Sequence, residues 1–136
     1  MPDLDFLVAT GTRRPSRRVL DAAKWFADTY GGPAVLLIVG DAKGFDEAIL
    51  SQWQNHGWPW WRHAAPWDAF EQAWGSWLAK VAGPARNAAM AGAAKKLRLC
   101  GLLGKGIAAP DAESQGTWVC VRDIEDAGLV VEVRNV

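Results

Sequence analysis

Short apolar segments alternate with longer amphipathic segments along the whole chain. The apolar segments have hydrophobic residues at nearly every position, and AVLLIV at 34–39 is the clearest case. This pattern is typical of strands that are buried on both faces of a parallel sheet. We expect five strands, at Asp5–Thr10, Ala34–Val39, Trp58–His63, Leu97–Leu102 and Leu129–Val133.

The segments between these strands have hydrophobic residues three and four positions apart, which predicts helices. The first helix follows Ser16, a good N-cap residue, and stops before Gly31. An alternation of strands and helices predicts a doubly wound, mostly parallel α/β sheet of about five strands in a single domain. We expect helices at Ser16–Tyr30, Asp46–His56, Trp67–Val81, Pro84–Lys96 and Thr117–Ala127.

The composition narrows the class of protein. The chain has 136 residues, enough for one domain, and 15 Lys and Arg balance 15 Asp and Glu. General nucleic-acid binding is not expected, because such proteins need an excess of basic residues. No apolar run approaches the roughly 18 residues of a membrane helix, and the acidic N-terminus is unlike a signal peptide. We therefore expect a cytoplasmic protein with no membrane partner.

The sequence lacks the usual patterns for metals and for common cofactors. Cys100 and Cys120 are accompanied only by His56 and His63, and no metal-ligand spacing connects them. The P-loop, the dinucleotide-binding glycine motif and the nucleophile elbow of hydrolases are also absent. We expect no metal and no cofactor.

Glycine-containing loops follow the predicted strands, at the sheet edge where open parallel sheets bind ligands. Glycine lets backbone N–H groups approach an anion, and a helix N-terminus attracts one. Each loop alone is better explained by tight turning, but together they predict a phosphate-binding site. The candidate ligand-binding residues are Gly11, Thr12, Arg13, Gly40, Lys43, Gly44, Asp46, Gly83, Arg86, Asn87, Ser114, Gly116 and Thr117, with Lys105 as a weaker one.

These candidates have different expected roles. Arg86 would hold a phosphate and Asn87 a ribose or base edge, with helix capping and packing as the alternative. Asp46 would bind ribose hydroxyls or cap its helix. Ser114 and Thr117 would bond phosphate oxygens or cap the last helix. No catalytic residue is assigned.

Nine tryptophans stand out, and seven of them lie between residues 53 and 77. Trp67 comes after a loop, at the very start of a predicted helix, and is the candidate for stacking on a base. Trp74 and Trp77 fit the apolar stripe of that helix, which predicts a place in the core or in a subunit interface. A domain of this size has little room to cover so many indoles. We therefore expect a homo-oligomer that buries the Trp-rich segment, including Trp58, Trp60 and Trp61.

Four motifs in this order resemble the SLOG superfamily, and most closely its YspA-like, YpsA-related branch. They are Gly11-Thr12-Arg13, Gly40–Asp46, Ala82–Met90 and Ser114–Thr117. The resemblance spans nearly the whole chain and implies a Rossmann-like fold that binds nucleotides or nucleotide-derived molecules. The superfamily includes enzymes similar to the cytokinin-activating phosphoribohydrolases and sensor domains for NAD-derived signals in antiphage systems. Its members commonly self-associate.

Two departures from the family pattern bear on function. Asp41 stands where the branch usually has a second glycine. Val119 and Cys120 replace the two acids of the phosphoribohydrolase motif, and an oxocarbenium-like transition state needs a nearby carboxylate. If the chain is an enzyme, Asp41, Asp46 or Glu113 would have to supply that carboxylate.

We therefore expect the chain to bind a nucleotide-derived small molecule, such as an NAD-derived or cyclic signal nucleotide. It would sense this molecule, or sequester it as a phage-type anti-immunity protein does. One alternative is a phosphoribohydrolase-like enzyme that cleaves nucleotide N-glycosidic bonds, against which the missing acids argue. The other is a Trp-rich protein-interaction module without nucleotide affinity.

Overall fold

A five-stranded parallel sheet lies at the centre of the computed structural model, which describes residues 3–76 and 80–136. The strand order is β3-β2-β1-β4-β5, and every pairing is parallel, as in a Rossmann-like fold. The strands are β1 (Phe6–Gly11), β2 (Leu36–Gly40), β3 (Trp60–His63), β4 (Gly104–Ala109) and β5 (Val131–Val133).

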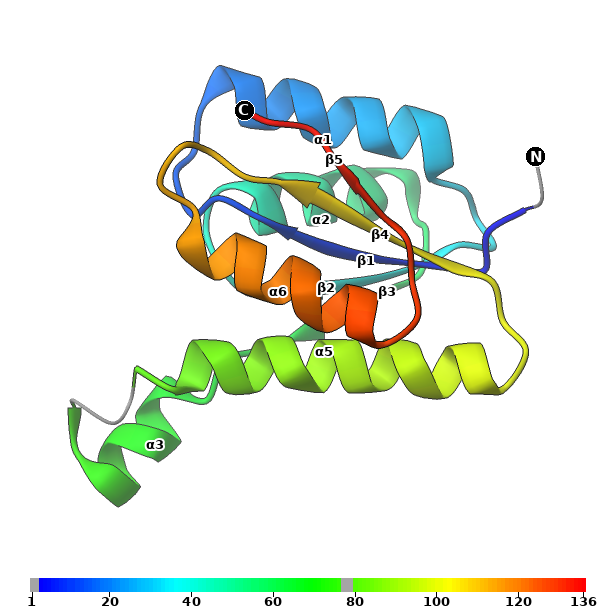
Figure 1. Cartoon of the computed structure of the whole chain (residues 1–136). Coiled ribbons are helices and arrows are strands. Elements are labelled where there is room, and N and C mark those ends of the chain that lie inside the picture. The colour runs from blue at the N-terminus through cyan, green and yellow to red at the C-terminus, as the bar shows by residue number, and fades with distance from the viewer. Residues whose placement is uncertain (1–2, 77–79) are drawn as a thin grey trace.

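Helices cover both faces of the sheet (Figure 1). On one face lie α1 (Arg17–Tyr30) and α2 (Phe45–His56), and on the other lie α5 (Ala82–Leu99) and α6 (Gln115–Asp126). The short helix α3 (Trp67–Trp74) projects away from the body beyond the start of α5. This arrangement confirms the predicted doubly wound α/β sheet. In the described part of the chain, no helix combines the length and the apolar character needed to cross a bilayer.

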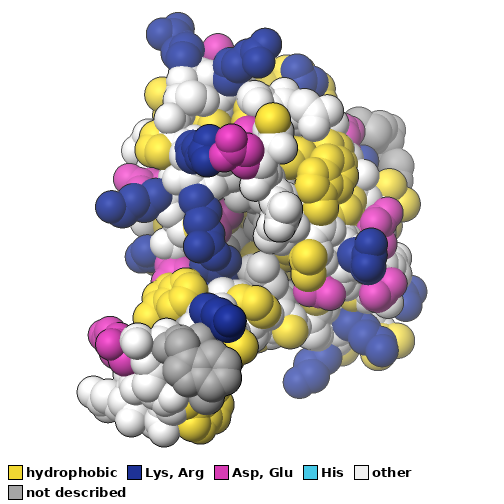
Figure 2. All heavy atoms as spheres, turned by 60° about the vertical axis from the view of Figure 1, so that its left-hand side comes forward, with side chains coloured by type: hydrophobic (Ala, Val, Ile, Leu, Met, Phe, Trp, Pro, Cys, Tyr) yellow, Lys and Arg dark blue, Asp and Glu magenta, His cyan; other side chains and the backbone are white. Residues whose placement is uncertain are grey.

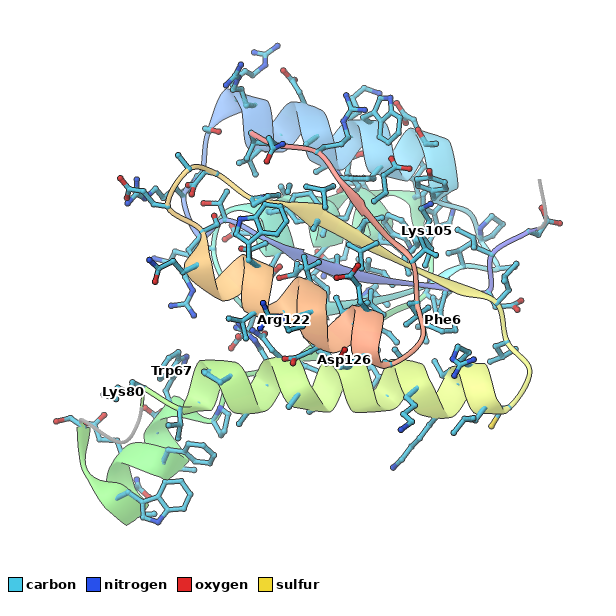
Figure 3. The ribbon with its side chains drawn as sticks, in the orientation of Figure 1. Phe6, Trp67, Lys80, Lys105, Arg122 and Asp126 are labelled. Carbon is cyan, nitrogen blue, oxygen red and sulfur yellow. The ribbon has the colours of Figure 1, made fainter. Side chains whose placement is uncertain are left out.

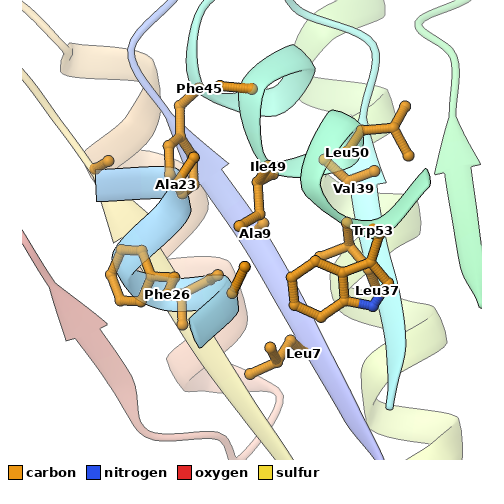
Figure 4. Close-up of a cluster of buried hydrophobic side chains, with 14 of the residues drawn as sticks. Leu7, Ala9, Ala23, Phe26, Leu37, Val39, Phe45, Ile49, Leu50 and Trp53 are labelled. Carbon is orange, nitrogen blue, oxygen red and sulfur yellow. The ribbon is translucent and has the colours of Figure 1, made fainter. Parts of the chain in front are cut away.

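Two apolar clusters hold the helices against the sheet. Figure 4 shows the cluster beneath α1 and α2, where Phe26, Ile49 and Trp53 pack on β1 and β2. The indole Nε1 of Trp53 donates a hydrogen bond of 3.0 Å to the carbonyl of Val35, so this fully buried ring has its polar atom satisfied. The second cluster lies beneath α5 and α6 and includes Phe6, Val8, Ile38, Met90, Ala94 and Ile124.

The predicted strand at Leu97–Leu102 is wrong. The alanine-rich helix α5 continues to Leu99, because Ala has a high helix propensity and Ala91 and Ala94 are buried on its inner face. The strand that follows is β4, which begins with two glycines in three residues. A Cβ atom at Gly104 would overlap the ring of Phe6, so the packing of the sheet requires glycine there.

Residues Gly104–Ala109 form β4, although the strand expected at Leu97–Leu102 would place them in a loop. Lys105 consequently lies at the amino end of this strand, opposite Leu7 of β1. Its Nζ atom is 3.6 Å from a carboxylate oxygen of Glu132. Figure 3 shows Lys105 at the far end of the sheet from Trp67. Lys105 is therefore not part of a site at the carboxyl edge.

The helix predicted at Trp67–Val81 ends early. It stops at Trp74, because Gly75 has a φ of +84°, a left-handed conformation that glycine adopts without strain. No residue of α3 is buried, so Trp74 is not in the core of this chain. Trp77 lies outside the described residues.

Candidate functional site

A cavity of about 370 Å³ lies at the carboxyl edge of the sheet. It opens between the loops that follow β1 and β4, where the direction of strand order reverses and open α/β sheets bind their ligands. Its volume lies within the roughly 300–1,000 Å³ of small-molecule sites. Figure 2 brings this edge forward and shows a hollow with Lys and Arg side chains along one side.

Nine of the predicted ligand-binding residues line this cavity, although they come from four separate segments of the chain. The end of β1 and the loop after it contribute three, α2 and α5 contribute three, and the start of α6 contributes three. They are Gly11, Thr12, Arg13, Asp46, Arg86, Asn87, Ser114, Gly116 and Thr117.

The remaining predicted residues lie around the cavity. Gly44 has a φ of +81° at the N-cap of α2, and the next N–H donates to the carbonyl of Thr12, which joins α2 to the β1 loop. Gly40 packs against Asp46 and Arg86, and Lys43 is exposed on the loop before α2. Gly83 is buried at the start of α5, with Trp67 beside it.

Arg86 forms an ion pair within the protein. Its side chain is only 7% exposed, and Nη1 donates a hydrogen bond of 2.7 Å to Oδ1 of Asp41. The other oxygen of Asp41 accepts the N–H of Ala65 at 3.0 Å. Burial alone would raise the pKa of Asp41, but the hydrogen bond and charge of Arg86, with the Ala65 N–H, lower it below its usual range. Asp41, which stands where the resembled branch usually has a glycine, is therefore the ion-pair partner of Arg86.

Asp46 is a buried carboxyl group on the wall of the cavity. Its Oδ2 atom accepts the N–H of Ala42 at 3.3 Å, so it closes the β2–α2 loop, whereas the N-cap of α2 is Gly44. Its Oδ1 atom is buried and has no hydrogen-bond partner among the described residues. Burial raises the pKa of Asp46 to about 7, although the charge of Arg86 opposes this shift.

The tight packing around Asp46 explains why residue 40 is a glycine. A Cβ atom at Gly40 would lie 2.7 Å from Oδ2 of Asp46 and 3.0 Å from Nε of Arg86. Any side chain at this position would displace one of the two charged groups.

Asp111 is a central residue of the cavity that the sequence analysis missed. Its carboxylate accepts hydrogen bonds from the hydroxyls of Thr12 at 2.6 Å and Ser114 at 2.7 Å, and from the N–H of Glu113 at 2.9 Å. These bonds lower the pKa of Asp111 to about 2. Asp111 follows the end of β4 by two residues, and the misplaced strand put it inside a long loop instead.

Arg13 differs from the other two arginines of the cavity. Arg86 is paired with Asp41, and Arg14 forms an exposed ion pair with Glu113 at the rim. Arg13 is exposed and, within the described part of the chain, has no carboxylate within ion-pair distance. Its guanidinium is therefore available to an anionic ligand.

The start of α6 also faces the cavity. Ser114 is the N-cap residue, but its side chain makes no capping hydrogen bond to the helix, since it is bonded to Asp111. Gly116 has open space where a side chain would be, and Thr117 is buried beside it. The first N–H groups of a helix carry partial positive charge. The start of α6 can thus receive an anion in the cavity that Arg13 also lines.

Trp67 lies near this site but outside the cavity lining. A Cβ atom at Gly83 would be 3.2 Å from Nη2 of Arg13 and 3.7 Å from Cη2 of Trp67, so both side chains approach the start of α5. Figure 3 shows Trp67 at the junction of α3 and α5. Trp67 is 38% exposed, and its stacking on a base stays a prediction.

The other tryptophans of the segment have different environments. Trp58 stacks on His56 at 4.1 Å and packs edge-on against Trp53, so part of its surface is covered within the chain. Trp60 and Trp61 lie on the edge strand β3 and are 45% and 46% exposed. Trp74 is also exposed and contacts Phe70 on α3. The homo-oligomer that would cover them stays a prediction.

Comparisons with known proteins bear on the fold. No protein family matches the sequence, and no curated protein matches it. Among solved structures, DNA processing protein A from Streptococcus pneumoniae is similar, with a TM-score of 0.53 and 15% identity. The fold is Rossmann-like. The likeness covers 95% of this chain and 58% of that one, so this chain spans a little over half of that protein's length.

Proposed function

We propose that the chain binds the phosphate group of a nucleotide-derived small molecule in the cavity between the β1 and β4 loops. The observation that carries this proposal is the pairing of Arg13, which lacks an ionic partner among the described residues, with the open start of α6. A guanidinium and a helix N-terminus together form a strong anion site. The four motifs that resemble the SLOG superfamily and the fold shared with DNA processing protein A support it.

The test is calorimetric titration of the protein with nucleoside monophosphates, NAD-derived nucleotides and cyclic nucleotides. A charged hydrogen bond contributes about 1.5–3 kcal/mol, so we expect Arg13→Gln to weaken binding by roughly 10- to 150-fold. Arg17→Gln is the matched control, because Arg17 is exposed on α1 and pairs with Asp21. Equal affinity of wild type and Arg13→Gln would refute the site.

Incubating the protein with the same nucleotides and analysing the products distinguishes binding from turnover. Recovery of the intact nucleotide after heating the protein fits sensing or sequestration of a signal nucleotide. Release of free base and ribose 5-phosphate would instead show a phosphoribohydrolase. Of the three carboxylates named as substitutes for the missing acids, Asp41 and Glu113 are ion-paired with arginines, which leaves Asp46. Asp46→Asn is therefore the variant that tests turnover.

A further inference from the structure

We propose that Asp46 recognises the sugar of the bound nucleotide, its Oδ1 atom accepting a hydrogen bond from a ribose hydroxyl. This inference rests on the proposed function, because it assigns a second part of the same ligand. It goes beyond a phosphate site, since it makes the cavity specific for a phosphorylated sugar rather than for any phosphate.

The first argument is the unsatisfied oxygen. Asp46 is only 5% exposed, and buried polar atoms of folded proteins are nearly always hydrogen-bonded. One oxygen is satisfied by the N–H of Ala42, whereas Oδ1 has no partner in the described part of the chain. Asp46 also lines the cavity. Oδ1 itself has almost no exposed surface, so the proposal requires the Asp46 carboxyl group to turn towards the cavity, where a ligand can supply the hydrogen bond that the protein does not.

The second argument is charge. Arg86 is the nearest cation, but it is already held by Asp41 at 2.7 Å and by the side-chain oxygen of Asn87 at 3.2 Å. In its charged form, Asp46 therefore keeps the capacity to accept a hydrogen bond and repels a phosphate. A neutral hydroxyl donor is the ligand group that satisfies a buried carboxylate without adding a second buried charge.

The third argument is spacing across the sheet. Asp46 follows β2, the start of α6 follows β4, and β1 lies between these strands. Two strand spacings amount to roughly 10 Å. Asp46 and the α6 anion site thus face one cavity from opposite sides. A nucleotide has its phosphate at one end of the sugar and its ring hydroxyls at the other, so one ligand can contact both.

The experiment compares ligands with and without the sugar hydroxyls. The probes are ribonucleoside 5′-monophosphates, their 2′,3′-dideoxy counterparts and ribose 5-phosphate, titrated into wild type and Asp46→Asn. An amide has one acceptor oxygen where a carboxylate has two, so the variant cannot serve both Ala42 and the ligand. We expect loss of the hydroxyls to weaken binding at least about tenfold in wild type and at most about twofold in Asp46→Asn.

The pH dependence gives a second readout. The charged and titratable groups around Asp46 are Arg86, Asp41, Arg13 and the Cys120 thiol. A hydroxyl that donates to the carboxylate favours its charged form, so binding should release a proton and tighten as pH rises through about 7. The phosphate of the ligand titrates near pH 6. Only the part of the pH dependence of binding that differs between wild type and Asp46→Asn is therefore assigned to Asp46.

The outcomes separate this inference from the function on which it rests. If ribonucleotides and dideoxynucleotides bind wild type equally well, the inference is overturned and the phosphate site stands. If the preference for hydroxyls persists in Asp46→Asn, another residue reads the sugar and the inference is again wrong. If neither these probes nor the NAD-derived and cyclic nucleotides bind, the proposed function fails and this inference fails with it. Thermal melts of both proteins verify that Asp46→Asn is folded.

Discussion

The buried ion pair of Arg86 and Asp41 allows a stringent test of how much this contact stabilises the fold. We consider Asp41→Asn, which removes the negative charge and keeps an oxygen for the N–H of Ala65. The substitution leaves Arg86, whose side chain is 7% exposed, without its carboxylate partner. The variant therefore isolates the loss of one buried charge.

The expected cost follows from the burial of the pair. Breaking a buried ion pair by removing one partner typically costs 3–5 kcal/mol. Asp41 is still 18% exposed and Asp46 lies close to Arg86, so the lower end applies. We expect the free energy of unfolding to fall by about 3 kcal/mol. For a domain of this size that corresponds to a decrease in Tm of roughly 10 °C.

Urea denaturation followed by circular dichroism measures this difference. The matched control is Asp21→Asn, because the Arg17–Asp21 pair on α1 has side chains that are 87% and 67% exposed. Exposed pairs of this kind contribute about 0.3–0.5 kcal/mol. If Asp41→Asn costs no more than Asp21→Asn, the buried pair does not stabilise the fold and the reasoning is refuted.

The pH dependence has a definite sign. The pKa of Asp41 is lowered in the folded protein, so the folded state holds its proton less tightly than the unfolded chain. The pair therefore stabilises the fold above the unfolded carboxyl pKa near 4, and this contribution is lost as pH falls through the folded pKa. The difference between wild type and Asp41→Asn should shrink below pH 4.

Four further predictions concern single residues. Because the pKa of Asp46 is raised to about 7, the free energy of unfolding of wild type should fall as pH rises from 4 to 7. Urea unfolding of Asp46→Asn should show little of this decrease. Asp111→Asn should tighten phosphate binding in calorimetry, because it removes a negative charge from the cavity and leaves one acceptor oxygen for the two hydroxyls; weaker binding would mean that the carboxylate positions them for the ligand. Gly40→Ala should lower Tm by several degrees, whereas Gly92→Ala, which has open space in α5, should not. Trp60→Ala should shift the mass measured by light scattering towards the monomer; an unchanged mass would exclude this residue from a subunit interface.

Most of the fold could be predicted, because its strands are buried on both faces and its helices have one apolar side. The apolar run at 34–39 includes all of β2 except its last residue, because a short, continuous apolar run between glycines is typical of a strand buried on both faces. The error at Leu97–Leu102 has a physical cause. The true strand β4 owes its place to glycines that fit against Phe6 and Val131, and such packing leaves no hydrophobic signal in the sequence.

The candidate site could be predicted only in part. Glycines and hydroxyls at the ends of strands point to the correct edge of the sheet, because parallel strands bring their carboxyl ends together. The pairing of Arg86 with Asp41 could not be predicted, since the two residues are 45 positions apart and meet only in the folded chain. The network at Asp111 was missed because its strand was misplaced.

The place of β1 in the sheet has a consequence for how the chain reaches its fold. β1 is the central strand, yet one of its two neighbours, β4, begins 98 residues after it. During synthesis the first strand can pair with β2, but its other edge stays open until residue 109 has left the ribosome. Pairing between distant segments is slow, and an open strand edge invites association with other chains. We expect the nascent chain to be most prone to aggregation while β4 is still missing, and to fold cooperatively once it appears.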